Sequence, residues 1–165
     1  MGVVPSFVGK QPTVSTENRR SDREVTGVTG QYEHNIDAKG RLFIPAKLRA
    51  ELGATFHVMV GQDHCLSIYS DESWKDIMER LRSLSYSEVK KLRTAFANAA
   101  DCEPDAQGRI LIPAKLRQYA GLEKEVVING SFGRAEIWNA ERWHAMERAD
   151  FDSGELEAAM ESMGL

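Results

Sequence analysis

Short runs in which apolar and polar positions alternate recur along the chain, and most are bounded by turn-forming residues such as Gly, Pro and Asp. Alternation with a period of two is typical of half-buried strands. The pattern therefore predicts several short strands joined by tight turns. In the first half of the chain the predicted strands are residues 31–36, 41–44, 56–60 and 65–69, the last two around a turn at 61–63.

A turn and a short helix flank the second of these strands. Asp37 favours the first position of a turn and Gly40 supplies the last, so the strands on either side should form a hairpin. Pro45 suits the first position of a helix, because its missing N–H would be unpaired there in any case. The helix that follows, residues 46–52, should end at Gly53, which can adopt a left-handed cap conformation.

The same pattern occurs twice. Residues 37–49 read DAKGRLFIPAKLR and residues 105–117 read DAQGRILIPAKLR, with ten of thirteen positions identical at an offset of 68 residues. Such a match indicates an internal duplication. The second copy should repeat the elements of the first, with strand residues Ile110 and Ile112, a helix from Pro113 to Gly121, a strand at 126–128, a turn at Asn129 and Gly130, and a strand at 135–138.

Helices are expected after each copy. Ser70 can cap one helix, Ser85 and Glu88 form a capping box for a second, and Asn139 can cap a third. Residues at helical spacing should face inward: Trp74, Ile77, Met78 and Leu81 in the first helix, Val89, Leu92 and Phe96 in the second, and Trp143 and Met146 in the third; a final amphipathic segment carries Leu156, Met160 and Met163.

The composition is that of a globular protein. Apolar residues make up 42% and charged residues 28% of the 165 residues, enough for one compact domain or two very small ones that share a core. No stretch approaches the roughly 18 apolar residues of a membrane span, and the N-terminus lacks the apolar core of a signal peptide. Cys65 and Cys102 form neither a CxxC pair nor a disulfide framework. We therefore expect a cytoplasmic protein.

The net charge of −4 is distributed unevenly. Residues 141–165 carry a net charge of −5, whereas residues 37–49 and 105–117 carry +3 and +2. A chain with basic motifs and an acidic end can still bind DNA, although the signal is local and weaker than a domain pI above about 9 would be.

Arg41 and Arg109 are the strongest candidates for function. Each follows an Asp…Gly turn on the strand face opposite the apolar residues, where its planar guanidinium can pair with phosphate or guanine. Asp37 and Asp105, four residues earlier, should fix the turn and orient the arginine, because a carboxylate that faced DNA would be repelled. The alternative is that both pairs are surface salt bridges that hold a hairpin.

Other basic residues differ between the copies or allow two interpretations. Lys39 lies at the tip of the first turn and fits a phosphate contact, whereas Gln107 takes that place in the second copy. Two further pairs lie on the predicted short helices, and each could be a solvated face or contact DNA: Lys47 with Arg49, and Lys115 with Arg117.

The Asp-x-x-x-Arg pattern, followed by a hydrophobic strand and Pro-Ala-Lys-x-Arg, occurs twice and resembles the MraZ family over about residues 29–150; each copy is similar to a SpoVT/AbrB-type half. The resemblance implies a transcriptional regulator that binds short direct repeats upstream of the division and cell-wall gene cluster, its own promoter included. It also implies a ring-like homo-oligomer in the nucleoid. The DNA-contacting motif then falls on Asp37, Lys39, Arg41, Asp105 and Arg109.

The expected fold is α+β. One copy supplies about four short strands, too few to bury a core alone. As in AbrB-like proteins, two swapped-hairpin halves should interleave into a pseudo-two-fold β-barrel with flanking helices, here within one chain. Trp74 and Trp143 are then core or interface anchors. The expected division is a flexible extension (1–28), repeat 1 (29–77), connecting helices (78–99), repeat 2 (100–143) and an acidic helical tail (144–165).

The sequence argues against an enzyme, because the four histidines are scattered and no Gly-x-Ser-x-Gly, His-Glu-x-x-His or phosphate-binding loop occurs. Asp63, His64 and Cys65 are a weak zinc candidate without partners at fixed spacing. We expect no cofactor, metal or small-molecule substrate. A protein-interaction module of the antitoxin type remains an alternative, since the acidic C-terminal helix could dock on a partner protein or on a neighbouring subunit, or fold back on its own chain.

Overall fold

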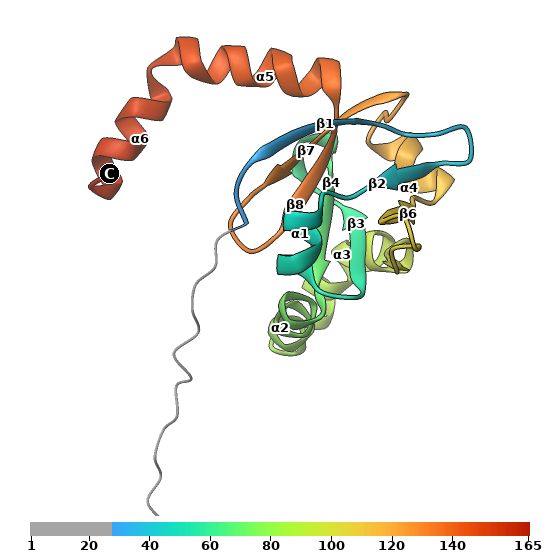
Figure 1. Cartoon of the computed structure of the whole chain (residues 1–165). Helices are drawn as coiled ribbons and strands as arrows, with labels where there is room; N and C mark the ends of the chain where they lie inside the picture. The colour runs from blue at the N-terminus through green and yellow to red at the C-terminus, as the bar shows by residue number, and fades with distance from the viewer. Residues whose placement is uncertain (1–27) are drawn as a thin grey trace, which may run out of the picture.

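The computed structural model describes residues 28–165 (Figure 1). The expected flexible extension lies outside the described residues except for its last residue, Val28, which is buried. The first copy and its helices comprise β1 (Gln31–Asn35), β2 (Arg41–Phe43), α1 (Ala46–Leu52), β3 (Phe56–Val60), β4 (Leu66–Ser70), α2 (Asp71–Arg82) and α3 (Tyr86–Ala97). The second comprises β5 (Ala100–Cys102), β6 (Arg109–Leu111), α4 (Ala114–Tyr119), β7 (Glu125–Gly130), β8 (Ala135–Asn139), α5 (Ala140–Ser153) and α6 (Glu155–Met163).

The strands of the two copies interleave. Six form one antiparallel sheet in the order β1-β7-β8-β4-β3-β5, and β2 pairs with β6 in a separate two-stranded sheet. Strand β1 of the first copy thus pairs with β7 of the second, and β5 of the second pairs with β3 of the first. Exchange of the two copies gives the same strand order read from the opposite edge of the sheet, so the chain has the expected pseudo-two-fold arrangement.

The expected barrel is not closed. Among the described residues, β1 and β5 are the two edge strands of the larger sheet, and each pairs on one side only. The β2–β6 pair lies apart from that sheet and is linked to it by the short β1–β2 turn, where Ile36 and Leu42 form a single bridge. The fold is therefore mixed α+β with an open antiparallel sheet.

The core lies between the two-stranded sheet, the short helices and the larger sheet. Leu42 and Ile110 are opposite each other at the centre of the β2–β6 pair, and both are fully buried. Since one residue comes from each copy, neither copy has a complete core of its own. The rest of the cluster includes Ile44, Leu48, Phe56, Val58, Leu66, Ile68, Ile112, Leu116, Ile128 and Ile137.

The predicted side-chain caps are confirmed, whereas Gly53 ends α1 with φ of +89° and ψ of −160° and not in the expected left-handed conformation. The Ser70 side chain accepts a hydrogen bond from the Ser73 N–H at the start of α2, and the Asn139 side chain accepts one from the Arg142 N–H at the start of α5. Ser85 and Glu88 form the reciprocal capping box of α3. Pro45 is the N-cap of α1 rather than its first helical residue, and its carbonyl accepts the first helical hydrogen bond.

The predicted turn at Asn129 and Gly130 is wrong. Both residues belong to β7, and the chain turns at residues 131–134, where Phe132 and Gly133 have φ of +43° and +81°. Positive φ at both central residues is typical of a tight hairpin turn. Gly130 serves another purpose, because a Cβ there would lie 2.5 Å from backbone atoms of Val28.

Helix α3 faces the body less than its pattern predicts. Phe96, near its C-terminal end, contacts Trp74, with ring centroids 5.7 Å apart, but Val89 and Leu92 are exposed. Trp74 and Trp143 are half-buried and anchor α2 and α5 through contacts with Tyr69 and Trp138. Between residues 28 and 165, no helix combines the length and apolarity needed to cross a bilayer.

Candidate functional site

Asp37 organises the turn between β1 and β2. Its Oδ1 accepts hydrogen bonds from the backbone N–H groups of Lys39 (3.0 Å) and Arg41 (2.9 Å), and its Oδ2 accepts one from Arg41 Nε (2.6 Å). Gly40 donates its N–H to the Asp37 carbonyl and has φ of +83°, a conformation that glycine adopts at little cost. Asp37 therefore fixes the turn and orients Arg41.

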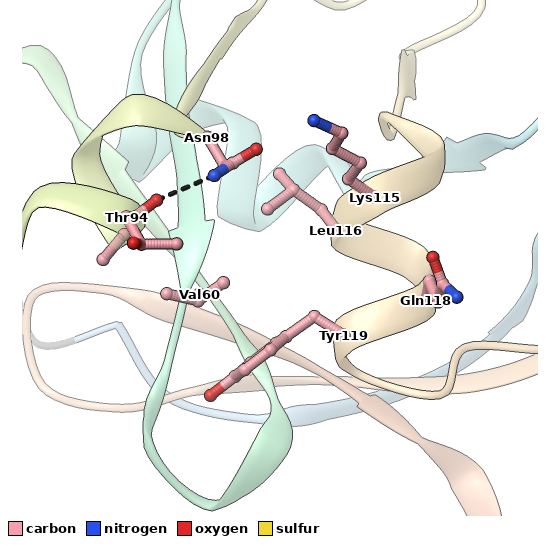
Figure 2. A pocket seen from close by; sticks show the side chains of 8 residues that line it. Val60, Thr94, Asn98, Lys115, Leu116, Gln118 and Tyr119 are labelled. Carbon is pink, nitrogen blue, oxygen red and sulfur yellow. Dashed lines mark hydrogen bonds between the residues drawn. The ribbon is translucent and has the colours of Figure 1, made fainter.

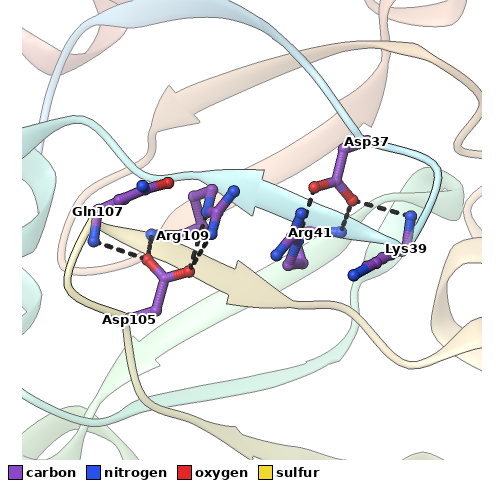
Figure 3. Close-up of polar contacts among 6 residues, drawn as sticks. All are labelled: Asp37, Lys39, Arg41, Asp105, Gln107 and Arg109. Carbon is purple, nitrogen blue, oxygen red and sulfur yellow. Dashed lines mark hydrogen bonds and ion pairs between the residues drawn. The ribbon is translucent and has the colours of Figure 1, made fainter.

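The second copy repeats this geometry. Asp105 Oδ1 accepts from the backbone N–H groups of Gln107 (2.9 Å) and Arg109 (3.0 Å). Its Oδ2 accepts from Arg109 Nε (2.9 Å) and lies 2.8 Å from Arg109 Nη2. Gly108 closes the turn with φ of +78°. Figure 3 shows the two turns at opposite sides of the β2–β6 pair.

These hydrogen bonds keep both carboxylates ionised. The backbone N–H of Arg41 contributes most to lowering the pKa of Asp37, helped by the Arg41 side chain and the Lys39 N–H. The backbone N–H and the guanidinium of Arg109 lower the pKa of Asp105 to about 2. Each arginine is thus held against a permanent negative charge at neutral pH.

The two arginines share one face of a ribbon composed of both copies. Strands β2 and β6 are antiparallel, with Arg41 opposite Leu111 and Phe43 opposite Arg109. Because side chains alternate between faces, these four residues lie on the outer face, and the residues between them face the core. Figure 3 shows Arg41 and Arg109 together on one face of the ribbon. The side chain of Arg41 is 32% exposed and that of Arg109 is 28% exposed.

The two guanidinium groups are not equally occupied. Arg41 binds Asp37 through Nε, whereas Arg109 approaches Asp105 with both Nε and Nη2. Within the part of the chain that the structure describes, the two Nη nitrogens of Arg41 have no hydrogen-bond partner. Arg41 therefore has more donors free for a ligand than Arg109 has.

Arg49 and Arg117 each cover the turn of the opposite copy. Arg49 donates from Nε to a carbonyl in its own copy (3.0 Å), and its Cζ lies 5.7 Å from the ring centroid of Phe43. A Cβ on Gly108 would lie 2.9 Å from Arg49 Cζ, and a Cβ on Gly40 would clash with Arg117 Nη1. These arginines thus pack against the turns and add positive charge beside them, whereas Lys47 and Lys115 are exposed.

Sequence reasoning missed these cross-copy contacts and one histidine cluster. His57, which is buried, lies with Nδ1 2.7 Å from Asp101 and Nε2 2.5 Å from Asp71, and its ring stacks on Trp74. The cluster ties α2 and the edge strand β5 to β3. Its partners are 14 and 44 residues away in sequence, so no local spacing could have indicated it.

The zinc candidate receives no support. Within residues 28–165, no group of three or more His, Cys, Asp or Glu side chains is placed to hold a metal ion. The Cys65 thiol donates to the carbonyl of Gln62 (3.1 Å), and burial raises its pKa to about 12. Burial also raises the pKa of Cys102, to about 11.

Comparisons with a family profile and with individual proteins point to the same family. The profile of the family described as "MraZ protein, putative antitoxin-like" matches residues 28–94 and again residues 95–163. The chain is 46% identical over 138 residues to a protein named transcriptional regulator MraZ from Lachnoclostridium phytofermentans, covering 82% of this chain and 96% of the relative. Proteins of the same name from Halothermothrix orenii and Thermoanaerobacter pseudethanolicus are 45% and 52% identical, covering 82% and 69% of this chain and 98% and 82% of each relative.

Proposed function

The chain belongs to the MraZ family, and we propose on that basis that it is a transcriptional regulator that binds double-stranded DNA in a sequence-specific manner. The observation that carries the proposal is the outer face of the β2–β6 ribbon. There Arg41 and Arg109 lie together, each oriented by an ionised aspartate. The resemblance and the geometry thus point to the same residues.

The physical match to DNA supports this site. A two-stranded ribbon fits the major groove, and an arginine can donate two parallel hydrogen bonds to the O6 and N7 of guanine. Because the aspartates already fix both side chains, little conformational entropy is lost when a base is bound. Lys39 at the exposed turn tip fits a phosphate contact. Asp37 and Asp105 orient the arginines rather than face the DNA.

The two copies contribute unequally in this proposal. The first copy has Lys39 at its turn and an arginine with free Nη donors, whereas the second has Gln107 and an arginine held twice by Asp105. We therefore assign base reading mainly to Arg41, with Arg109 as its weaker counterpart.

The targets in this proposal are short direct repeats upstream of the division and cell-wall gene cluster, including the promoter of the protein's own gene. The protein represses them from the cytoplasm, associated with the nucleoid, as a ring-like homo-oligomer. One ribbon alone would bind weakly, but several ribbons on one assembly convert later contacts into intramolecular ones. The resemblance to the family supports this part of the proposal.

Fluorescence anisotropy with labelled DNA from upstream of the gene tests the proposal. Each good arginine–guanine pair contributes about 1–3 kcal/mol, so Arg41→Ala should weaken binding by about 5- to 150-fold per engaged ribbon and abolish it for the assembly. Arg109→Ala should have a smaller effect. Lys75→Ala, on the exposed surface of α2, removes a positive charge away from the ribbon and should leave the affinity nearly unchanged.

Salt dependence separates this function from a module that binds only proteins. Binding through several phosphate contacts makes the logarithm of the affinity fall linearly with the logarithm of the salt concentration, with a slope of about −0.9 per contact. Arg41→Ala should keep the oligomer size of the wild type. If the wild type does not bind promoter DNA at low salt, or if Arg41→Ala binds it as specifically as the wild type, the proposal fails.

A further inference from the structure

The C-terminal arm, residues 149–165, packs against no other element in the part of the chain that the structure describes. It comprises the end of α5 and the whole of α6, and every residue in it is exposed. Figure 1 shows α6 projecting from the body beyond α5, with the C-terminus at its far end. A helix of nine residues is unstable alone in water, so α6 needs a surface to pack against.

One face of α6 is built for such packing. Leu156, Met160 and Met163 follow one another at intervals of four and three residues, which places them on one side of the helix. All three are exposed. Glu155 and Glu157 flank this apolar stripe on either side. The arm therefore presents an apolar surface bordered by negative charge.

A groove lies between α3 and α4. It has a volume of about 570 Å³, and Ala95 of α3 belongs to its lining. Figure 2 shows Val60 of β3 between the side chains from α3 and those of Leu116 and Tyr119 from α4. The polar residues on its lining are uncharged except for Lys115. Tyr119 is held by a hydrogen bond from its hydroxyl to the Gly61 carbonyl, so the groove is preformed on that side.

The charges of the arm and the groove are complementary. The arm contains five acidic residues and no basic residue. The groove has Lys115 on its α4 side, and Lys91 lies on its α3 side, on the same helix face as Thr94 and Ala95 three and four residues later. An apolar stripe between two glutamates therefore matches an apolar groove between two lysines.

We propose that α6 of one copy of this protein docks in the α3–α4 groove of a second copy, with its Leu156–Met160–Met163 stripe in the groove and its glutamates toward Lys91 and Lys115. In this structure α6 lies away from α3 and α4 of its own chain (Figure 1), so the contact requires the groove of another copy. This inference rests on the proposed homo-oligomer and assigns the surfaces that build it.

The contact joins two different surfaces, so each copy has one arm and one groove to offer. A head-to-tail contact of this kind adds copies until the chain of subunits closes on itself. The arm thereby sets the number of DNA-binding ribbons held together, although it takes no part in reading DNA.

Variants of the arm test the interface in the full-length protein. Leu156→Asp with Met160→Asp introduces charge into the stripe, and Ala158→Asp with Ser162→Asp introduces the same charge on the opposite side of α6 as a matched control. All four side chains are exposed, so neither change should disturb the fold. Mass photometry should show loss of all species above the monomer for the first variant and the wild-type distribution for the control.

Mixing two defective variants tests the groove. Lys91→Glu with Lys115→Glu should also be monomeric, because the glutamates of the arm would then meet like charge. When the arm variant and the groove variant are mixed, one intact arm and one intact groove remain between them. The mixture should form heterodimers and nothing larger, while each variant alone stays monomeric.

The outcomes separate this inference from the proposed function. A wild-type distribution for the arm variant, or larger oligomers in the mixture, overturns the arm–groove contact and leaves the homo-oligomer and DNA binding standing. A monomeric wild type overturns both the contact and the proposed oligomer. Loss of promoter binding by Arg41→Ala, with oligomer size unchanged, supports the ribbon whatever the arm does.

Discussion

Replacement of Leu42 by alanine tests whether the two copies form one folding unit. Leu42 is fully buried at the centre of β2 and faces Ile110 of the second copy across the ribbon. Truncation of a fully buried leucine costs about 2–5 kcal/mol, because transfer free energy is lost and a cavity remains. We take about 3 kcal/mol for this site. Leu111→Ala is the matched control, because Leu111 lies on the outer face of the same ribbon and is 59% exposed.

Urea unfolding at one fixed protein concentration provides the measurement, since the stability of an oligomer depends on concentration. With a denaturant slope of about 2 kcal/mol per molar urea, a loss of 3 kcal/mol lowers the midpoint by about 1.5 M. The control should change the free energy of unfolding by less than about 1 kcal/mol.

Tryptophan fluorescence then shows whether the second copy responds to a change in the first. In a Trp74→Phe background the remaining tryptophans, Trp138 and Trp143, both belong to the second copy and its helix. If the interleaved strands form one core, fluorescence and circular dichroism will give the same lowered midpoint. A second-copy signal that keeps its wild-type midpoint, or equal shifts for Leu42→Ala and Leu111→Ala, would refute the reasoning.

Three further predictions follow from the turns and the thiols. Gly40→Ala should destabilise the fold more than Gly133→Ala. Both glycines have φ near +80°, so alanine costs about 1–3 kcal/mol at either position, but only the Cβ at position 40 meets a guanidinium, that of Arg117. Equal losses of stability in thermal unfolding would contradict this. The pKa of Asp105 is about 2 in the folded protein and near 4 in the unfolded chain, so its stabilising effect is complete above about pH 5 and is lost as the pH falls from about 4 to 2; Asp105→Asn should lack this dependence in acid unfolding curves. The buried thiols of Cys65 and Cys102, with pKa values of about 12 and 11, should be alkylated at pH 8 at least ~100-fold more slowly in the folded protein than in urea, and fast alkylation under native conditions would show that they are accessible.

Several features of the structure could be predicted from the sequence because they depend on contacts between residues close together in the chain. The Asp37 turn, the capping box at Ser85 and the cap at Asn139 each depend on contacts within four residues, and each was found where the pattern placed it. The candidate site could be predicted from the sequence for the same reason, since the two residues of each Asp–Arg pair are four positions apart. The duplication strengthened the prediction, because it showed the same turn chemistry twice.

The pattern of apolar and polar residues failed to predict the structure where contacts between residues distant in the sequence decide it. Asn129 and Gly130 have the composition of a hairpin turn, yet both belong to β7, where Asn129 pairs with Gln31 of β1 on the other side from β8. Similarly, the pattern on α3 predicts Val89 and Leu92 as inward residues, but the helix meets the body mainly near its C-terminal end. In both cases a neighbour distant in sequence decides the outcome.

The sequence by itself determined the duplication, the α+β class, the Asp–Arg turns and the family, because these follow from residue identity and short spacing. Only the tertiary structure decided that β2 and β6 pair across the copies, that Arg41 and Arg109 therefore share one face, and that the sheet stays open. It also decided that α6 projects from the body. The physical reason is that strands pair in the arrangement that buries their apolar residues in one core. The residues of this core come from both copies, and equivalent positions of the two copies are 68 residues apart in the sequence.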